Sequence, residues 1–390
     1  MISQTFYPTK YVLQAGAHRD IFSVIGTEFS RLFVVTGKKA MHEAGVLKRL
    51  EDQCFDKNIE LHIYRGVTTN PTHAEVDGIV AACKSFGADA VMGLGGGSSI
   101  DIAKMVAMLC SNPGSCWDYI SVSGRKGRKI EKRDVRLFAL PTTSGAGSET
   151  TPYAVITHAE TLMKKGMGSP HLYPDVAIID AELLALMPQE QVAVTGFDAF
   201  GQALEGFTSG KSTLHSEFYG LNALRYITKH FEDAYSDPKN LTAKEGMAWG
   251  ASLAGLSIGL VDVNLAHAIS HPLSGRYNIQ HGLAVALCTA PAIWFNRHAV
   301  GDKYVQVASM LGSHCCDKDE AALVVIKYFQ GLASKFGIDL ALRNHGIPQD
   351  ALDLLAEEAM EIGAIRTNVI DVSQADVRAL LGLVWRGAYA

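Results

Sequence analysis

The C-terminal half of the chain carries one aspartate and three histidines in a spacing that suits a metal site. Asp198 precedes Gln202 by four residues, His267 precedes His271 by four, and His281 follows ten residues later. A spacing of four places both members of a pair on the same face of a helix. A carboxylate and two imidazoles can hold a divalent cation of the iron or zinc type and leave one position open for a substrate. A single histidine is more often a packed core residue, but three within fifteen positions favour a site.

A glycine-rich segment in the N-terminal half suits the binding of a phosphate. An apolar run continues into Gly95, Gly96 and Gly97, and Ser98 then opens a helix. Glycines allow a backbone to approach a pyrophosphate closely, and the free N–H groups and dipole of a helix N-terminus favour an anion. The segment is neither G-x-G-x-x-G nor a Walker loop, because no Gly-Lys-Ser or Gly-Lys-Thr follows. A tight turn without a ligand is the alternative.

A second polar segment, residues 140–151, follows another apolar run. Thr142, Thr143 and Ser144 are consecutive, and three small residues that leave room for a ligand separate them from Ser148. Each hydroxyl can donate a hydrogen bond to phosphate or ribose oxygens. The alternative is that these hydroxyls only cap the next helix.

Two kinds of structure must position these residues. Up to about residue 185, short β-branched runs alternate with longer amphipathic ones. Strands are predicted over 32–36, 60–64, 90–93, 136–140 and 176–179, and helices over 40–54 and 72–86. This alternation predicts a mostly parallel sheet with helices on both faces. Helical periodicity then takes over, so we expect an α/β domain over 1–185 and an all-helical domain over 186–390, packed closely around a deep groove.

Composition excludes several classes of partner. The 390 residues include 35 basic and 40 acidic side chains, a formal charge of -5, which gives no electrostatic footprint for a nucleic acid or an anionic membrane. The apolar stretch over 283–295 is shorter than the ~20 residues that span a bilayer, and the N-terminus lacks a secretory signal. Seven cysteines without C-x-x-C spacing predict reduced thiols. We expect a cytoplasmic protein with a small-molecule substrate.

Together these motifs resemble those of the iron-containing (group III) alcohol dehydrogenase family. The resemblance rests on Gly-Gly-Gly-Ser-Ser-Ile-Asp at 95–101, Pro-Thr-Thr-Ser-Gly-Ala-Gly-Ser-Glu at 141–149, Gly-Phe-Asp-Ala at 196–199 and the histidine segment 267–282. It covers nearly the whole chain, in the family's order and spacing. It implies an N-terminal dinucleotide-binding α/β domain and a C-terminal all-helical domain with a metal between them, an architecture shared with dehydroquinate synthase. Dehydroquinate synthase and glycerol-1-phosphate dehydrogenase are more distant cousins that the histidine segment fits less well.

The resemblance also implies individual roles. It makes Asp198, His267 and His281 metal ligands, with Gln202 at the fourth ligand position, and it places His271 beside the nicotinamide and substrate. Our hypothesis is that His271 is the catalytic residue that relays the proton, and the alternative is that it only supports the metal ligands structurally. The implied cofactor-binding residues are Asn70, Gly96, Gly97, Ser98, Lys104, Thr142, Thr143, Ser148 and Lys165.

The sequence departs from the family at Gln202, where a histidine is usual. An amide oxygen is a harder and generally weaker ligand for zinc or ferrous iron, so the metal affinity should fall, or the site keeps three protein ligands and a water. A metal-free enzyme is an open alternative, because some relatives work without metal. In another alternative, Gln202 turns aside and hydrogen-bonds a polar substrate.

Two further positions bear on the cofactor and the substrate. The segment after the strand at 32–36 offers no carboxylate for a ribose 2′-hydroxyl, whereas Gly37 leaves room and Lys38 and Lys39 supply positive charge. These residues favour NADP(H) over NAD(H), although both lysines could simply solvate a helix start. Arg276 lies between the site histidines and could hold a carboxylate or phosphonate of an acidic aldehyde. The alternative is that Arg276 pairs with an acidic residue of the helical domain.

We therefore expect an NAD(P)-dependent alcohol dehydrogenase or aldehyde reductase that uses Fe2+ or Zn2+. The metal would polarise the carbonyl oxygen while hydride passes between nicotinamide and a small alcohol or aldehyde. A non-catalytic dinucleotide-binding protein with a decayed metal site at Gln202 is the alternative from another functional class. The resemblance further implies a homodimer or a larger homo-oligomer.

Overall fold

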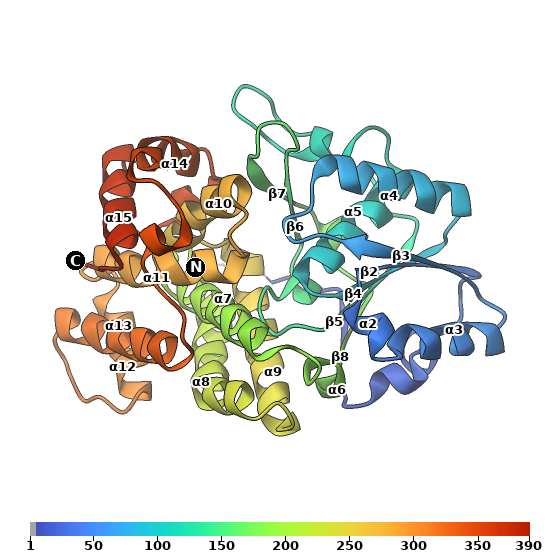
Figure 1. Ribbon diagram of the computed structural model, residues 1–390, viewed down its shortest axis with the longest axis horizontal. Coiled ribbons are helices and arrows are strands. Elements are labelled where there is room, and N and C mark those ends of the chain that lie inside the picture. The colour runs from blue at the N-terminus through green and yellow to red at the C-terminus, as the bar shows by residue number, and fades with distance from the viewer. Residues whose placement is uncertain (1–4) are drawn as a thin grey trace. The chain divides into compact units, whose positions relative to one another are not determined.

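The computed structural model describes residues 5–390, which form two compact units (Figure 1). One unit comprises Phe6–Pro188 together with Pro238–Ala248, and the other comprises Gln189–Asp237 and Trp249–Ala390. We call them the α/β unit and the helical unit. The inclusion of Pro238–Ala248 in the α/β unit was not foreseen by a single division after residue 185.

The α/β unit is built on a six-stranded parallel sheet with the order β1-β8-β5-β4-β2-β3. The strands are β1 (Lys10–Leu13), β2 (Arg31–Gly37), β3 (Glu60–Val67), β4 (Ala90–Gly95), β5 (Arg136–Pro141) and β8 (Val176–Ile179). The parallel sheet of the predicted fold class is confirmed. A separate antiparallel hairpin, β6 (Tyr153–Thr157) and β7 (Lys164–Gly168), was not predicted.

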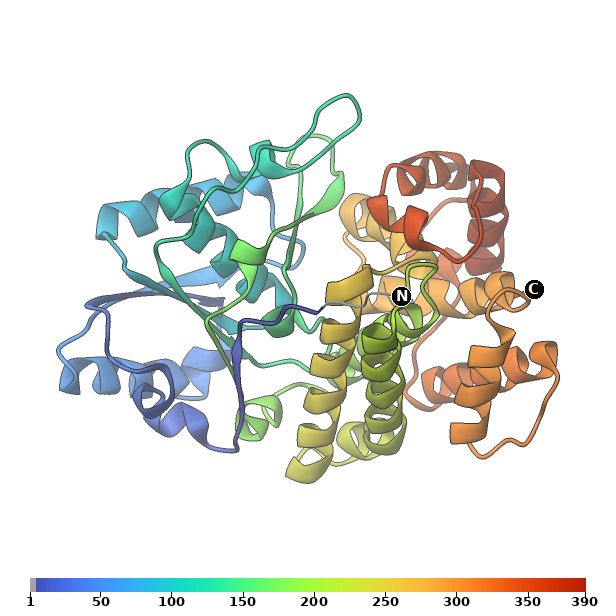
Figure 2. The same ribbon diagram turned by 180° about the vertical axis from the view of Figure 1, so that it is seen from behind.

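Helices cover both faces of this sheet, which explains why its central strands are almost wholly apolar. On β2, Phe33 and Val35 pack into a core with α4 (His73–Phe86) and α5 (Gly97–Ser111). The alternate residues Leu32 and Val34 pack into a second core with α1 (Phe22–Ile25) and α3 (Val46–Asp56). The two views show α4 and α5 on one side of the sheet and α3 on the other (Figures 1 and 2). The period of two therefore places each strand side chain in one of two cores.

Local breaks in the α/β unit follow from particular residues. The single helix predicted over 40–54 is two helices, α2 (Ala40–Glu43) and α3, because Gly45 between them takes a φ of 72°, which ends the first helix. Before the chain enters α7, the short helix α6 (Ala181–Leu184) is capped by Asp180, whose side chain accepts from the N–H of Glu182. The prediction of one continuous helix over 40–54 was wrong because a glycine inside an amphipathic pattern was given no weight.

The helical unit is confirmed, and its helices run from α7 to α15. They are α7 (Gln189–Thr208), α8 (Leu214–Ser236), α9 (Leu241–Val261, shared with the α/β unit), α10 (Leu265–Tyr277), α11 (His281–Asn296), α12 (Gly301–Met310), α13 (Lys318–Lys335), α14 (Leu352–Met360) and α15 (Gln374–Arg386). Glycines let α7 approach its neighbours closely. A Cβ on Gly196 would lie 2.1 Å from the Phe231 ring of α8.

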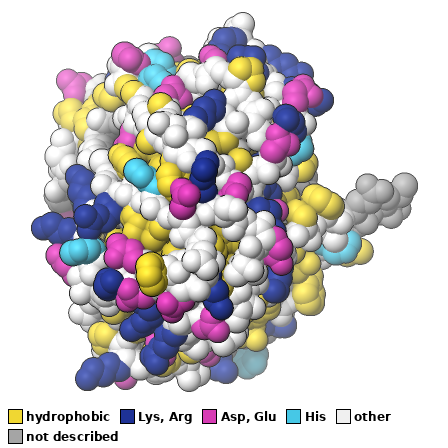
Figure 3. All heavy atoms as spheres, turned by 90° about the vertical axis from the view of Figure 1, so that its right-hand side faces the viewer, with side chains coloured by type: hydrophobic (Ala, Val, Ile, Leu, Met, Phe, Trp, Pro, Cys, Tyr) yellow, Lys and Arg dark blue, Asp and Glu magenta, His cyan; other side chains and the backbone are white. Residues whose placement is uncertain are grey.

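The surface and helix lengths agree with the balanced composition. On the face that Figure 3 shows, Lys and Arg side chains are interspersed with Asp and Glu rather than gathered into a patch of one sign. Within the described residues no single helix is long and apolar enough to cross a membrane, and only the bent pair α9 and α10 meets that test jointly. All seven cysteines are free thiols.

We predict that Gly282→Ala destabilises the helical unit. A Cβ at Gly282 would lie 2.0 Å from the Val194 carbonyl oxygen of α7, a backbone atom that cannot turn aside. Overpacking of this kind costs about 1–3 kcal/mol or more. Thermal or urea unfolding measures the change. Gly331→Ala in α13 is the matched control, because nothing lies within 4 Å of its added Cβ, and alanine there should stabilise the helix. Equal stability of both variants would contradict the close approach of α7 and α11.

Candidate metal centre

Three side chains from three helices of the helical unit converge on one point. Asp198 lies on α7, His267 on α10, and His281 is the first residue of α11. One ligand atom from each lies within 4.8 Å of the other two. The Asp198 Oδ1 is 3.3 Å from His267 Nε2 and 3.8 Å from His281 Nε2. The structure therefore brings together the carboxylate and the two imidazoles that the sequence singled out.

Local sequence explains how these helices come close enough. Gly201 on α7 faces α11 and α10, because an added Cβ would meet Val285 Cγ1 at 2.7 Å and His267 Cε1 at 3.7 Å. Asn278 ends α10 in the left-handed conformation, with a φ of 52°, and the chain reaches His281 three residues later. Asparagine adopts that conformation more readily than other non-glycine residues. A short turn therefore brings His281 back beside His267.

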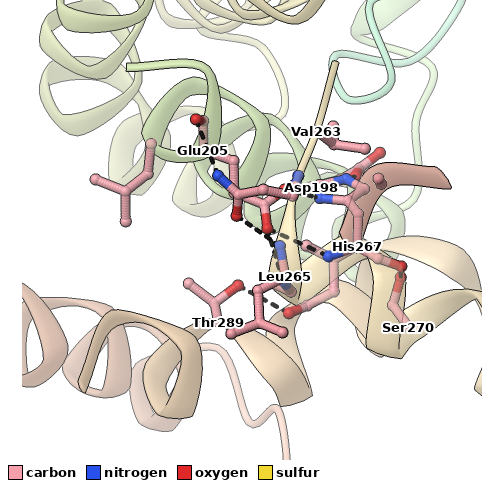
Figure 4. Close-up of polar contacts among 12 residues, drawn as sticks. Asp198, Glu205, Val263, Leu265, His267, Ser270 and Thr289 are labelled. Carbon is pink, nitrogen blue, oxygen red and sulfur yellow. Dashed lines mark hydrogen bonds and ion pairs between the residues drawn. The ribbon is translucent and has the colours of Figure 1, made fainter. Parts of the chain in front are cut away.

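Glu205 holds His267 in place, a contact that the sequence analysis missed. The Glu205 carboxylate accepts a hydrogen bond from His267 Nδ1 at 2.5 Å and another from the backbone N–H of Ala266 at 2.7 Å (Figure 4). A third comes from the backbone N–H of Asn264 at 3.1 Å. With Nδ1 bound to Glu205, Nε2 is the nitrogen that faces Asp198, as in metal sites where a carboxylate orients a ligating histidine. The available signal was the spacing of Asp198, Gln202 and Glu205 at intervals of four and three along one helix face.

The charges of this cluster favour a cation. Asp198, Glu205 and His267 are buried, with exposed fractions of 4%, 6% and 2%. Burial would lower the pKa of His267, but the carboxylates of Glu205 and Asp198 raise it to about 10. Two buried carboxylates on either side of one imidazole thus stabilise a positive charge between them, which a divalent ion would also supply.

Gln202 has the property expected of an oxygen ligand. It lies on α7 one turn beyond Asp198, is 3% exposed, and its Oε1 is buried without a hydrogen-bond partner among the described residues. Buried polar atoms are nearly always satisfied, so such an atom calls for an explanation, and an ion is one. The donor set of two imidazoles, a carboxylate and an amide oxygen fits a divalent transition metal.

The structure treats the other two residues predicted near this centre differently. His271, one helical turn beyond His267, is buried, and its ring centroid lies 5.7 Å from that of His281. Arg276 instead forms a two-point ion pair with Glu358 of α14, with its Nε 2.6 Å from one carboxylate oxygen and its Nη2 on the other. The structure thus shows the alternative for Arg276, an acidic partner within the helical unit, and its contacts give no support to a role in holding substrate.

The two polar segments predicted to bind the cofactor lie against each other in the α/β unit. The Thr142 N–H donates to the Gly95 carbonyl at 2.9 Å, at the carboxyl ends of β4 and β5. A Cβ on Gly96 would meet Thr143 Cγ2 at 3.3 Å, and one on Gly97 would meet Ser148 Oγ at 3.3 Å. Ser98 follows in the first turn of α5. Ligands of parallel α/β sheets bind at these strand ends, and the use of both segments for a cofactor stays a prediction.

The remaining residues predicted to contact the cofactor form two groups: two lie in open surroundings at the end of β2, and three contact or are buried among other residues of the α/β unit. Gly37 ends β2 with nothing within 4 Å of an added Cβ, and Lys38 is exposed beside it. Asn70 accepts a hydrogen bond from Lys164 at 2.8 Å, and Lys165 is buried in β7. Lys104 is fully buried, and its ammonium donates to the carbonyls of Thr151 and Tyr153.

The contacts of Lys104 call for a correction. Burial lowers its pKa to about 8, and its two carbonyl partners tie α5 to the start of β6. The described contacts of Lys104 therefore connect two elements of the α/β unit, which corrects the prediction that Lys104 binds the cofactor. In the sequence, Lys104 is flanked by apolar residues, and this pattern does not indicate which groups its ammonium contacts.

Comparison with known proteins agrees with this geometry. A family model described as "Iron-containing alcohol dehydrogenase" matches residues 8–181, and one described as "Fe-containing alcohol dehydrogenase family, C-terminal" matches residues 192–385. The sulfoacetaldehyde reductase of Bilophila wadsworthia is 31% identical over 343 residues, which are 87% of either chain. The NAD-dependent methanol dehydrogenase of Bacillus methanolicus is 27% identical and covers 96% of this chain and 99% of its own.

Solved structures give the same result. The archaeal halo-thermophilic Red Sea brine pool alcohol dehydrogenase ADH/D1 superimposes with a TM-score of 0.93 at 30% identity, over 98% of this chain and 99% of its own. The NADH-dependent butanol dehydrogenase A of Thermotoga maritima superimposes with a TM-score of 0.89 at 28% identity, over 98% of either chain. The two family models together match most of both units, and the chain belongs to the iron-containing alcohol dehydrogenase family.

Proposed function

We propose that this chain is a metal-dependent, nicotinamide-linked oxidoreductase that interconverts a small alcohol and its aldehyde. The observation that carries the proposal is the convergence of Asp198, His267 and His281 within 4.8 Å. Four residues after Asp198, the buried Gln202 Oε1 has no hydrogen-bond partner among the described residues. Relatives named as alcohol dehydrogenases and aldehyde reductases support the reaction class.

The donor atoms of the cluster give each residue a task. We propose that Asp198, Gln202, His267 and His281 hold one Fe2+ or Zn2+ ion, and that Glu205 fixes the ring of His267 so that Nε2 is the donor. Bound there, the cation would act as a Lewis acid that stabilises negative charge on the alcohol or aldehyde oxygen. Burial of Asp198, Glu205 and His267 strengthens the charge interactions among them.

His271 is our candidate for proton movement. It is buried, lies one helical turn beyond His267, and its ring is close to that of His281. Imidazole is the side chain whose ordinary pKa suits proton transfer near neutral pH. We propose that His271 gives a proton to the substrate oxygen during reduction and takes it back during oxidation.

For the substrate we propose a small alcohol or aldehyde without an anionic group that Arg276 must hold. Two relatives are named for sulfoacetaldehyde and lactaldehyde reduction. In this chain, however, Glu358 already occupies the Arg276 guanidinium in two-point geometry, which is a strong arrangement for such a pair. An acidic substrate would have to displace that carboxylate.

The proposed function predicts that metal content and turnover fall together. In His267→Ala one imidazole donor is lost and Glu205 is left without its partner, so both bound metal and aldehyde reduction should drop to background. Elemental analysis of the purified protein, with NADH and NADPH oxidation measured on a panel of small aldehydes, provides the two readouts. A wild-type enzyme that turns over without metal would support the metal-free alternative. Tight dinucleotide binding with no turnover on any aldehyde would support the non-catalytic one.

Glu205 should matter through its charge. In Glu205→Gln an oxygen acceptor for the Ala266 N–H is kept, but the negative charge beside His267 is removed. Loss of a carboxylate that orients a metal-bound histidine typically costs about 10–100-fold in metal affinity. Chelator competition measures that affinity, and circular dichroism checks the fold. Glu358→Gln makes the same chemical change in the same unit at Arg276 and should leave the metal affinity unchanged. An equal loss in both variants would show a general effect on the unit.

The residues after β2 generate a prediction about the cofactor. Relatives whose names state a cofactor name NAD or NADH, whereas this chain has no carboxylate at that place and two lysines instead. We propose that NADP(H) is favoured over NAD(H). Gly37→Asp adds a carboxylate into open space. That carboxylate should repel a 2′-phosphate and accept hydrogen bonds from a 2′-hydroxyl. We therefore expect the ratio of kcat/KM for NADPH to that for NADH to fall by about tenfold or more. A wild-type enzyme that works better with NADH would contradict the proposed preference.

A further inference from the structure

Two cysteines of the α/β unit are in direct contact. Cys83 lies near the C-terminal end of α4 and Cys110 near that of α5. Their Sγ atoms are 3.5 Å apart. The two helices run side by side in both ribbon views (Figures 1 and 2). Such a distance is a contact between two thiols without a covalent bond, since a disulfide bond is about 2.05 Å long.

The two thiols differ in access and in acidity. Cys83 is fully buried, whereas Cys110 is partly exposed. The hydrogen bond between the two sulfurs lowers the pKa of Cys110, and the charge of Lys84 acts in the same direction. The same hydrogen bond and burial raise the pKa of Cys83. The thiolate is the reactive form of cysteine. Cys110 is therefore the sulfur that an oxidant would reach first and the one that would react with it first.

The other buried thiols lack this combination. Burial raises the pKa values of Cys54, Cys116 and Cys288, which disfavours their thiolate forms. Cys315 and Cys316 are adjacent in sequence beyond the end of α12, outside the α/β unit. Cys83 and Cys110 are instead 27 positions apart, so a bond between them would join two separate helices.

We propose that Cys83 and Cys110 form a redox-responsive thiol pair that hydrogen peroxide converts into a disulfide. The Cys110 thiolate attacks one peroxide oxygen, which breaks the O–O bond and gives a sulfenic acid and hydroxide. The Cys83 sulfur then displaces the sulfenic oxygen, which leaves as water, and the S–S bond forms. Two thiols are oxidised by two electrons, and the peroxide is reduced to two waters once the released hydroxide is protonated.

The product would tie the last turns of α4 and α5 together. The sulfurs must approach each other by about 1.5 Å to reach the length of a disulfide bond, and α4 and α5 share one apolar core in which Cys83 is already packed. The pair lies entirely in the α/β unit, whereas the proposed metal ligands all lie in the helical unit. The redox proposal is therefore independent of the proposed function and can succeed or fail separately.

The test uses the full chain as purified, with redox-active metal removed from the buffer, and measured amounts of hydrogen peroxide. We expect the number of titratable thiols in the unfolded protein to fall from seven to five, and peptide mapping without reductant to find one bridge between Cys83 and Cys110. Dithiothreitol should restore all seven thiols. Seven unchanged thiols, or a bridge elsewhere with both of these thiols intact, would overturn the proposal.

Variants test the order of attack. In Cys83→Ala, which keeps a small side chain in the buried position, the sulfenic acid at Cys110 should accumulate and react with dimedone. In Cys110→Ser neither the bridge nor that adduct should form. Cys316→Ser removes an exposed thiol and is the matched control, in which the bridge should form as in the wild type. Absence of a dimedone adduct at Cys110 in Cys83→Ala, or bridging lost equally in Cys316→Ser, would contradict the mechanism.

Discussion

The hydrogen bond between the Glu205 carboxylate and His267 Nδ1 is the contact on which the proposed metal centre depends. Glu205 also accepts from backbone N–H groups at the start of α10, so one buried side chain fixes both the beginning of that helix and the ring of the histidine on it. A buried carboxylate is costly unless hydrogen bonds or positive charge surround it. Asp198, on the same face of α7, adds a second buried negative charge. Two buried carboxylates favour a cation between them, and for the same reason they raise the pKa of His267.

Each unit carries its own part of the chemistry. In the helical unit, glycines at 201 and 282 allow α7, α10 and α11 to approach until their side chains converge. In the α/β unit, parallel strands deliver the glycine turn of β4 and the hydroxyl-rich segment after β5 to neighbouring positions at the same edge of the sheet. Gln202 is where this chain departs from the histidine usual in its family. Its oxygen is buried and has no hydrogen-bond partner in the part of the chain that the structure describes, as expected of a ligand in a site with one imidazole fewer and one oxygen more.

Much of this could be predicted from the sequence because periodicity and spacing determine which residues share a face. The side chains of β2 alternate between two cores, one on each face of the sheet. The spacing of His267, His271 and His281 in the sequence indicated one site, and His267 and His281 do converge. Partners distant in sequence could not be predicted. Nothing in the sequence around Arg276 identifies Glu358, and nothing around Lys104 reveals that its ammonium binds the carbonyls of Thr151 and Tyr153. For Glu205 the spacing from Asp198 and Gln202 placed it on the same helix face, but its partner lies on a helix that begins some sixty residues later and could not be predicted.

X-ray absorption at the zinc edge tests the central claim most directly, because it counts the atoms bound to the ion. For the zinc-loaded protein we expect two imidazole nitrogens together with oxygen ligands at about 2.0–2.2 Å. The imidazole count should rise to three in Gln202→His and stay at two in Gln202→Ala. A wild-type spectrum with no imidazole signal, or the same imidazole count in wild type and Gln202→His, would contradict the assignment of His267, His281 and Gln202 to one metal ion.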